Sequence, residues 1–222
     1  MTPKISRFLF TALLLSQIPI NAEVSIPTES TPEIKAFSPL PKIEVFFSPE
    51  DHLDEKLIDE LNNAKKRILV AMYALFHKKI AEALIAAHKR GVVVKLVVDP
   101  YSRSGYGKSS MLVQAGIVVH LFNPSALYDE KESVEAERSF DDEQTKSFAP
   151  IMHHKFAIID DLLWTGSFNW TQQASNVNKE NAVKIRDMSI LLLYKKQFDE
   201  LFDKAQKLNP SLREDSAKED YE

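Results

Sequence analysis

Cysteine is absent from the 222-residue chain. Without a thiol, the chain contains no disulfide scaffold, no cysteine-ligated zinc, no thiol nucleophile and no lipid-modified N-terminal cysteine. Apolar residues make up 44% of the sequence. This fraction is too high for a disordered protein and suits one globular domain with appendages.

A hydrophobic run long enough to span a membrane with ease is also missing. The run at 8–20 is interrupted by polar residues and is shorter than the roughly 20 residues that a transmembrane helix needs. Lys4 and Arg7 precede this run, and Ala22 offers a small residue for cleavage. This layout is typical of a secretory signal peptide. We therefore expect residues 1–22 to be a signal peptide and the protein to be periplasmic or secreted, with an uncleaved anchor or a buried helix as the alternatives.

Positive charge is not in excess, because 28 Lys+Arg stand against 32 Asp+Glu. Negative charge is concentrated in the segment 123–150, with 8 acids and 3 bases, and in the tail 209–222, with 5 acids and 2 bases. This balance argues against a general nucleic-acid coat, but it leaves room for a local anion site on the core. The sequence shows neither a basic stripe nor clustered aromatic residues, and both absences weaken a role in nucleic-acid binding.

Proline-rich residues 23–41 predict a linker before one folded domain at 42–208. The acidic segment 123–150 is expected to be a solvated loop or a lid, and 209–222 a disordered tail. Hydrophobic periodicity predicts strands at 43–47, 68–75, 92–98, 117–122, 152–159, 162–167 and 181–185, and helices near 53–64, 80–88, 110–115 and 189–208. The predicted fold class is α/β, with a mixed, largely parallel β-sheet sandwiched between helices.

Residues with reactive side chains gather in the predicted hairpin. Alternate side chains of a strand share a face, so His153 and Lys155 are expected to point the same way, and so are Ser167 and Asn169. If the two strands pair, one surface collects an imidazole, an ammonium, a hydroxyl and an amide. This set suits an anionic phosphate. A neutral His153 could attack phosphorus and form a covalent phosphohistidine.

A metal site is not expected in this hairpin, and no cofactor is implied. His153 and His154 are adjacent on a strand and therefore do not form a pair of ligands on one face. Asp160 falls on the face opposite His153 if the strand stays regular, so its expected place is the turn.

The spacing His-x-Lys-x4-Asp, followed by Gly-Ser-x-Asn, resembles the HKD motif of the phospholipase D superfamily. The resemblance extends over about residues 43–205, and it implies the phospholipase D/nuclease fold. It implies a catalytic set in which His153 is the nucleophile, Lys155 binds phosphate and Asp160 completes the motif. In the small bacterial nucleases of this superfamily, a glutamate hydrogen-bonds the catalytic histidine, and Glu180 holds the corresponding position.

The resemblance further implies that Lys155, Ser167 and Asn169 bind the substrate phosphate. The chain departs from the family pattern, because it has five residues between Asp160 and Gly166 where six are usual. The shorter connection either tightens the hairpin or shifts the register of the strand that carries Ser167 and Asn169.

A second complete His-x-Lys-x4-Asp motif is absent from the chain. Displacement at phosphorus needs a nucleophile and, on the opposite side, an acid, and one histidine cannot supply both. The family resemblance implies that small members with one motif form C2 homodimers, in which two motifs meet at the interface. We therefore expect a homodimer in which His153 is the nucleophile in one subunit and the acid in the other.

Three functions are compatible with these residues. The favoured one is a metal-independent phosphodiesterase that cleaves nucleic acid as an endonuclease. The second is a phospholipase D that hydrolyses phospholipid head groups. The third is a non-catalytic phosphate-binding module, which would have no need of a nucleophile.

Overall fold

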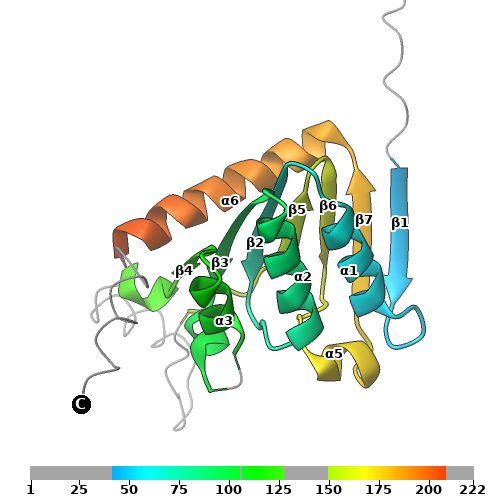
Figure 1. The fold of residues 1–222 in the computed structure, drawn as a ribbon, viewed down its shortest axis with the longest axis horizontal. Coiled ribbons are helices and arrows are strands. Elements are labelled where there is room, and N and C mark those ends of the chain that lie inside the picture. Colours follow the sequence, from blue (N-terminus) through cyan, green and yellow to red (C-terminus); the bar gives the residue numbers. More distant parts are fainter. Residues whose placement is uncertain (1–41, 106, 128–149, 209–222) are drawn as a thin grey trace, which may run out of the picture. The chain divides into compact units, whose positions relative to one another are not determined.

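The structure, a computed structural model, describes residues 42–105, 107–127 and 150–208. The expected signal peptide, the linker, most of the acidic segment and the tail lie outside the described residues. Within the described part, seven strands form one sheet in the order β1-β7-β6-β5-β2-β3-β4. Helices lie on both faces of this sheet (Figure 1).

The elements agree in kind with most of the predicted ones. The strands are β1 (Lys42–Phe47), β2 (Arg67–Met72), β3 (Val93–Val98), β4 (Val118–Leu121), β5 (Lys155–Ile159), β6 (Leu162–Gly166) and β7 (Asn181–Arg186). The helices are α1 (Leu53–Asn63), α2 (Lys78–Lys89), α3 (Ser109–Gln114), α5 (Gln172–Asn176) and α6 (Met188–Leu208). Two 3-10 turns, η1 (Pro100–Arg103) and η2 (Pro124–Leu127), follow β3 and β4.

The sheet is mixed, as predicted, but the expectation that it is largely parallel is wrong. β2, β3 and β4 run parallel, whereas the pairs β1–β7, β7–β6, β6–β5 and β5–β2 are antiparallel. Helices α2 and α3 supply the crossovers that parallel neighbours need. The turn between β5 and β6 has only Asp160 and Asp161, so these strands can pair only in the antiparallel sense.

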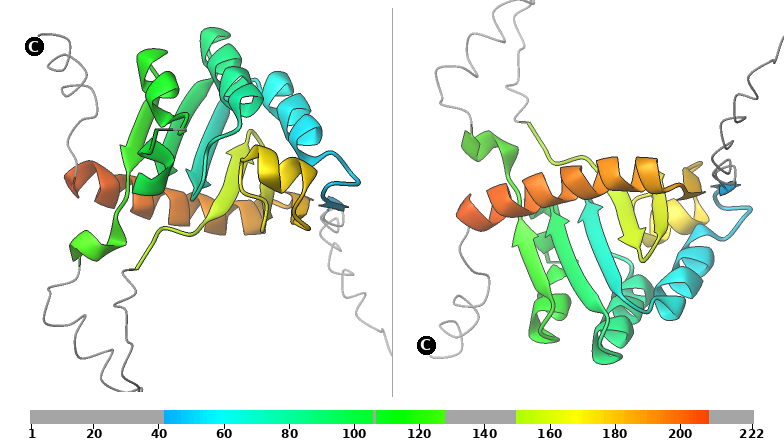
Figure 2. Two further views of the ribbon diagram at one scale, coloured as in Figure 1. Left: turned by 90° about the horizontal axis from the view of Figure 1, so that it is seen from below. Right: turned by 90° about the horizontal axis from the view of Figure 1, so that it is seen from above.

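Two apolar layers enclose the sheet. Leu53, Leu57 and Leu61 recur every fourth residue of α1 and are fully buried in the layer that α1, α2 and α3 share. On the other face, α6 contributes Leu191 and Phe198 to the second layer. Figure 2 shows α6 crossing the face opposite α1, α2 and α3. The sheet therefore has apolar side chains on both faces, which leaves the strand ends as the place for polar chemistry.

Two local differences from the predicted elements bear on the site. The strand expected from Met152 begins at Lys155, because the Met152 N–H donates to the Asp99 carboxylate at 3.0 Å instead of joining a ladder. The short helix α5 was not predicted, since five residues carry too little periodicity. None of the helices in the described ranges is both long and apolar enough to span a bilayer.

Candidate active site

The predicted site residues gather at one edge of the sheet. At this edge β1, β2, β3 and β6 end, and the antiparallel strands β5 and β7 begin. His153 and Lys155 stand at the start of β5, Ser167 follows β6, and Glu180 precedes β7. Ligands of open α/β sheets commonly bind beyond the carboxyl ends of the parallel strands, which is this same edge.

His153 and Lys155 share one aromatic neighbour, Tyr73. The imidazole packs against the Tyr73 ring, with 4.7 Å between ring centroids and an interplanar angle of 60°. The Lys155 Nζ lies 4.9 Å from the centroid of that ring and donates to the His153 carbonyl oxygen at 2.8 Å. The imidazole and the ammonium are therefore neighbours, as predicted, although His153 precedes the strand.

Burial and neighbouring charges shift the pKa values of His153 and Lys155. Burial lowers the pKa of Lys155 to about 8, although the charges of Glu180 and Asp99 raise it. Burial and the Lys155 charge lower the pKa of His153, against the effect of Asp99. A histidine with a lowered pKa is neutral at physiological pH, which is the form that can attack phosphorus.

Glu180 lies near the site but does not bond the histidine within one chain. Its Oε2 accepts from the Ser167 hydroxyl at 2.6 Å, and its Oε1 accepts from the Asn178 Nδ2 at 3.0 Å. The described residues provide no hydrogen bond from Glu180 to His153. Within the single chain, the expected hydrogen bond between Glu180 and His153 is therefore not formed. Glu180 instead orients the Ser167 hydroxyl.

The short hairpin keeps Ser167 at the site. Ile159 pairs with Leu162 across the turn, and the Ser167 hydroxyl also accepts from the Asn181 N–H at 3.0 Å. Asn169 is held between two backbone anchors, because the N–H of Phe168 bonds Asn181 and the N–H of Trp170 bonds Ala74. The Asn169 Oδ1 is buried without a hydrogen-bond partner. Its amide therefore retains hydrogen-bonding capacity.

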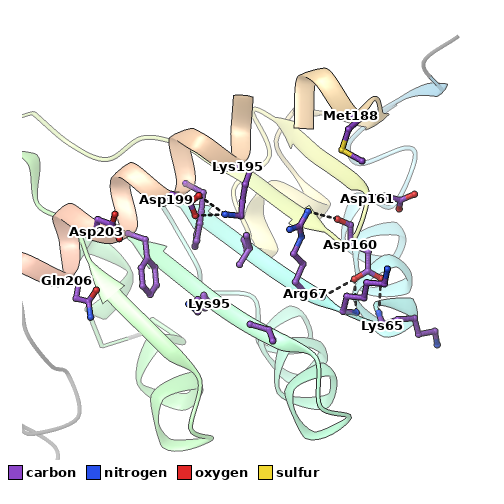
Figure 3. A pocket seen from close by; sticks show the side chains of 15 residues that line it. Lys65, Arg67, Lys95, Asp160, Asp161, Met188, Lys195, Asp199, Asp203 and Gln206 are labelled. Carbon is purple, nitrogen blue, oxygen red and sulfur yellow. Dashed lines mark hydrogen bonds and ion pairs between the residues drawn. The ribbon is translucent and has the colours of Figure 1, made fainter. Parts of the chain in front are cut away.

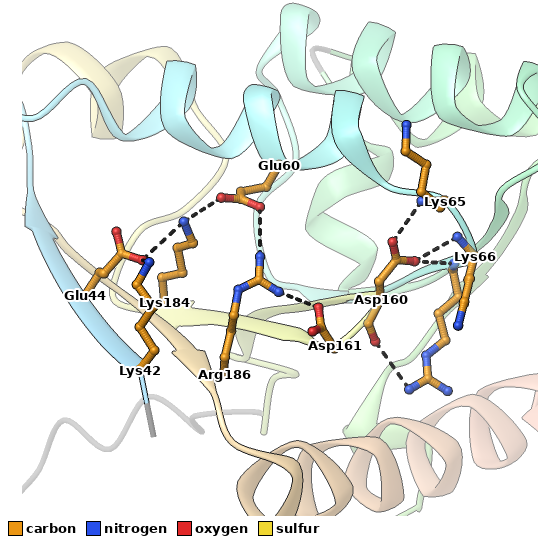
Figure 4. A network of polar contacts seen from close by, with 10 residues as sticks. Lys42, Glu44, Glu60, Lys65, Lys66, Asp160, Asp161, Lys184 and Arg186 are labelled. Carbon is orange, nitrogen blue, oxygen red and sulfur yellow. Dashed lines mark hydrogen bonds and ion pairs between the residues drawn. The ribbon is translucent and has the colours of Figure 1, made fainter. Parts of the chain in front are cut away.

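Asp160, the third member of the motif, lies at the opposite end of β5 (Figure 4). Its carboxylate accepts from the backbone N–H groups of Lys65, Lys66 and Arg67 at 2.8–2.9 Å. Burial opposes ionisation, but these N–H groups hold the pKa of Asp160 below its ordinary value. The structure therefore corrects the placement of Asp160 among the catalytic residues: it ties the start of β2 to the hairpin turn.

Asp99, which stands directly after β3, is not among the site residues expected from the sequence. Asp99 is only 5% exposed, and its two carboxylate oxygens accept from the N–H groups of Tyr101 and Met152. Because Met152 precedes His153, this carboxylate fixes the approach of the segment that carries the histidine. Asp99 could have been found from its position, because it is an acid directly after the β-branched run 92–98, at the carboxyl end of a predicted parallel strand.

A cavity of about 1170 Å³ lies elsewhere, on the α6 side of the sheet (Figure 3). Arg67, Val93 and Asp160 line it, together with Lys195 and Phe198 of α6. His153, Lys155 and Ser167 are not in its lining. Among the described residues, no three acidic or histidine side chains group closely enough to hold a metal ion.

Comparison with known proteins shows the family of the chain. The family model described as "Cardiolipin synthase, PLD-like domain" matches residues 57–202. The chain belongs to the phospholipase D-like family. A mitochondrial cardiolipin hydrolase from Chlamydomonas reinhardtii is 31% identical over 150 residues, which are 67% of this chain and 56% of that protein. A phospholipase D from Rickettsia typhi is 26% identical over 191 residues, or 85% of this chain and 80% of that protein.

Two solved structures share the phospholipase D-like fold. Nuc from Salmonella typhimurium, a phospholipase D family member, is 27% identical with a TM-score of 0.58 and covers 74% of this chain and 95% of its own. NucT from Helicobacter pylori is 24% identical with a TM-score of 0.61 and covers 74% and 97%. The mixed sheet between helices is therefore the fold of this family.

Proposed function

We propose that the protein is a metal-independent phosphodiesterase that cleaves nucleic acid through a covalent phosphohistidine. One observation carries the proposal: the imidazole of His153 and the ammonium of Lys155 pack on one ring at the functional edge of the sheet. The ammonium can hold a phosphodiester oxygen while the imidazole faces phosphorus. The Asn169 Nδ2 can donate to a remaining oxygen, whereas the single hydroxyl proton of Ser167 is already donated to Glu180 and must turn from it to bind phosphate.

The proposed reaction has two displacements. A neutral ring nitrogen of His153 attacks phosphorus, the P–O bond to the leaving group breaks, and the leaving oxygen takes a proton from an imidazolium. Water then gives a proton to the imidazole that acted as the acid and attacks phosphorus, and the P–N bond breaks, which regenerates the nucleophilic imidazole and the imidazolium. Because each chain carries one such histidine, the imidazolium is His153 of the partner subunit in a homodimer.

The surface that we propose for the partner is the exposed apolar side of β1. Ile43, Val45 and Phe47 alternate along this edge strand and are 53%, 50% and 56% exposed. The strand ends beside the site, since the backbone N–H of Ser48 bonds the Glu180 carbonyl at 3.0 Å. A second copy seated here would bury apolar area and place its own motif near the first.

Phospholipid is the second candidate substrate. It is favoured by the names of relatives, which include cardiolipin hydrolases and a phospholipase D. The description of Nuc as a phospholipase D family member, which shares the fold over 95% of its length, points to neither substrate. Export, expected from residues 1–22, stays a prediction that N-terminal sequencing of the mature protein would test.

The first experiment incubates the purified protein with plasmid DNA in EDTA, at low and moderate salt, beside a His153→Ala control. We expect nicking by the wild type only, and we expect it to weaken as salt rises, because a polyanion releases counterions on binding. Absence of nicking, with release of product from cardiolipin vesicles, would assign the site to phospholipid instead.

Sedimentation tests the proposed interface. We expect Val45→Asp to sediment as a monomer and to lose activity. Val93→Asp is the matched control, because Val93 is 52% exposed at the opposite end of the sheet and should leave the dimer intact. A dimeric, fully active Val45→Asp protein would exclude β1 as the shared surface.

A further inference from the structure

Three aromatic rings lie together beside His153, although the sequence shows no aromatic cluster. Tyr73 and Tyr101 stack with 5.4 Å between centroids and 21° between planes. Phe76 meets Tyr101 edge to face at 5.0 Å. Tyr73 also contacts the His153 imidazole. The rings meet because Tyr73 and Phe76 follow β2 and Tyr101 follows β3, and these strands are parallel neighbours whose ends coincide.

The cluster extends outward from the reacting groups. Tyr73, which touches His153 and carries Lys155 over its ring, is half-buried, whereas Tyr101 is 50% exposed. The described residues give Tyr101 no contact with His153 or Lys155. Tyr101 is therefore one ring further from the scissile phosphate, where a group attached to that phosphate would lie.

Cations accompany the rings. Lys79 is exposed three residues after Phe76, and Arg103 is exposed two residues after Tyr101. The Lys108 N–H bonds the carbonyl of Leu75, which places Lys108 beside the same loop. These three side chains have no ion-pair partner among the described residues. Cations interleaved with aromatic rings are typical of surfaces that bind single-stranded nucleic acid.

We propose that Tyr73, Phe76 and Tyr101 form a base-stacking subsite that holds a nucleobase of a single-stranded nucleic acid next to the phosphodiester at His153. This proposal rests on the nuclease function and names its substrate class. We expect single strands to be preferred over the duplex of plasmid DNA, because paired bases in a duplex stack on each other and do not offer their faces. A cationic lipid head group fits less well, since Lys155 and the neighbouring cations would repel it.

The test compares two single-stranded DNA oligonucleotides of equal length, one with all its bases and one built of abasic nucleotides. Wild type, Tyr101→Leu and Tyr101→Trp are measured on both. We expect the wild type to show a lower KM for the oligonucleotide that carries bases. Tyr101→Leu should raise that KM by about 5- to 150-fold with a smaller effect on kcat, since stacking contributes that much affinity per base. Tyr101→Trp should keep the preference for bases.

Val93→Ala is the control for loss of an exposed apolar side chain far from the site. The subsite is disproved if Tyr101→Leu keeps the wild-type preference for bases, or if it changes kcat and KM for both oligonucleotides in parallel. Failure of the nuclease function looks different. The wild type would then cleave neither oligonucleotide while it hydrolyses cardiolipin vesicles, and the stacking subsite would be withdrawn with it.

Discussion

The two ends of β5 hold residues of one motif, but their environments differ. At the start of the strand, His153 and Lys155 contact a tyrosine ring, and the ammonium donates to the carbonyl oxygen of His153. At the other end, the Asp160 carboxylate accepts from three backbone N–H groups. Groups with spare donors can bind a ligand, whereas groups with satisfied partners hold the fold.

The satisfied end is reinforced by charge pairs. Glu60 pairs with Lys184 at 2.6 Å and with Arg186 at 3.7 Å, and Arg186 also pairs with Asp161 of the turn. This network joins α1, β7 and the β5–β6 turn (Figure 4). Most of these side chains are only partly exposed, so the network holds the turn in place, and the short hairpin keeps its register.

The largest expected effect is the loss of the nucleophile. His153→Ala should lower kcat by at least about 10⁴-fold, because the covalent path is removed. Because the His153 side chain is exposed, the melting temperature of the His153→Ala protein should stay within about 2 °C of the wild-type value. Kinetics and calorimetry on one preparation check both statements. Unchanged turnover would refute the phosphohistidine mechanism.

The next effect concerns the ammonium. Lys155→Ala should lower kcat/KM by about 10²- to 10³-fold, as for other groups that stabilise charge in a transition state. In the wild type, kcat/KM should fall as the pH rises through about 8, because burial lowers the pKa of Lys155 to about 8 and the ammonium loses its charge there. The phosphodiester stays ionised over this range. A rate that rises through pH 9 would contradict this assignment.

At the other end of β5, the expected effect is on stability. Asp160→Asn should lower the free energy of unfolding by about 1–3 kcal/mol, because an amide oxygen replaces a charged acceptor for three N–H groups. Denaturant titration measures this loss. The kcat of the folded protein should stay close to the wild-type value. A large loss of kcat without loss of stability would show that Asp160 has a catalytic role.

The smallest effect tests how the acids act on Lys155. Glu180 raises the pKa of that ammonium, so Glu180→Gln should move the alkaline fall of kcat/KM to lower pH. The pH profile separates this effect from lost positioning of Ser167, which would lower the rate equally at every pH. An unmoved profile would show that the two charges do not interact.

Much of the site could be predicted from the sequence. Period-two alternation around 153–169 and the residue types sufficed to bring His153, Lys155 and Ser167 to one place, because a hairpin brings nearby residues together without help from the rest of the chain. The same alternation placed Asp160 in the turn. Long apolar periodicities likewise predicted α1, α2 and α6.

Other features depended on contacts between segments far apart in the chain. Asp99 meets Met152 across 53 positions, and Tyr73 meets Tyr101 only because β2 and β3 end at one edge. The predominance of antiparallel pairs follows from the insertion of β5 next to β2, and no local pattern indicates that placement. Residue types and local periodicity therefore suffice to identify the reactive groups and their hairpin. The tertiary structure alone decided which distant carboxylate and rings surround them, since those contacts depend on strand order rather than on local periodicity.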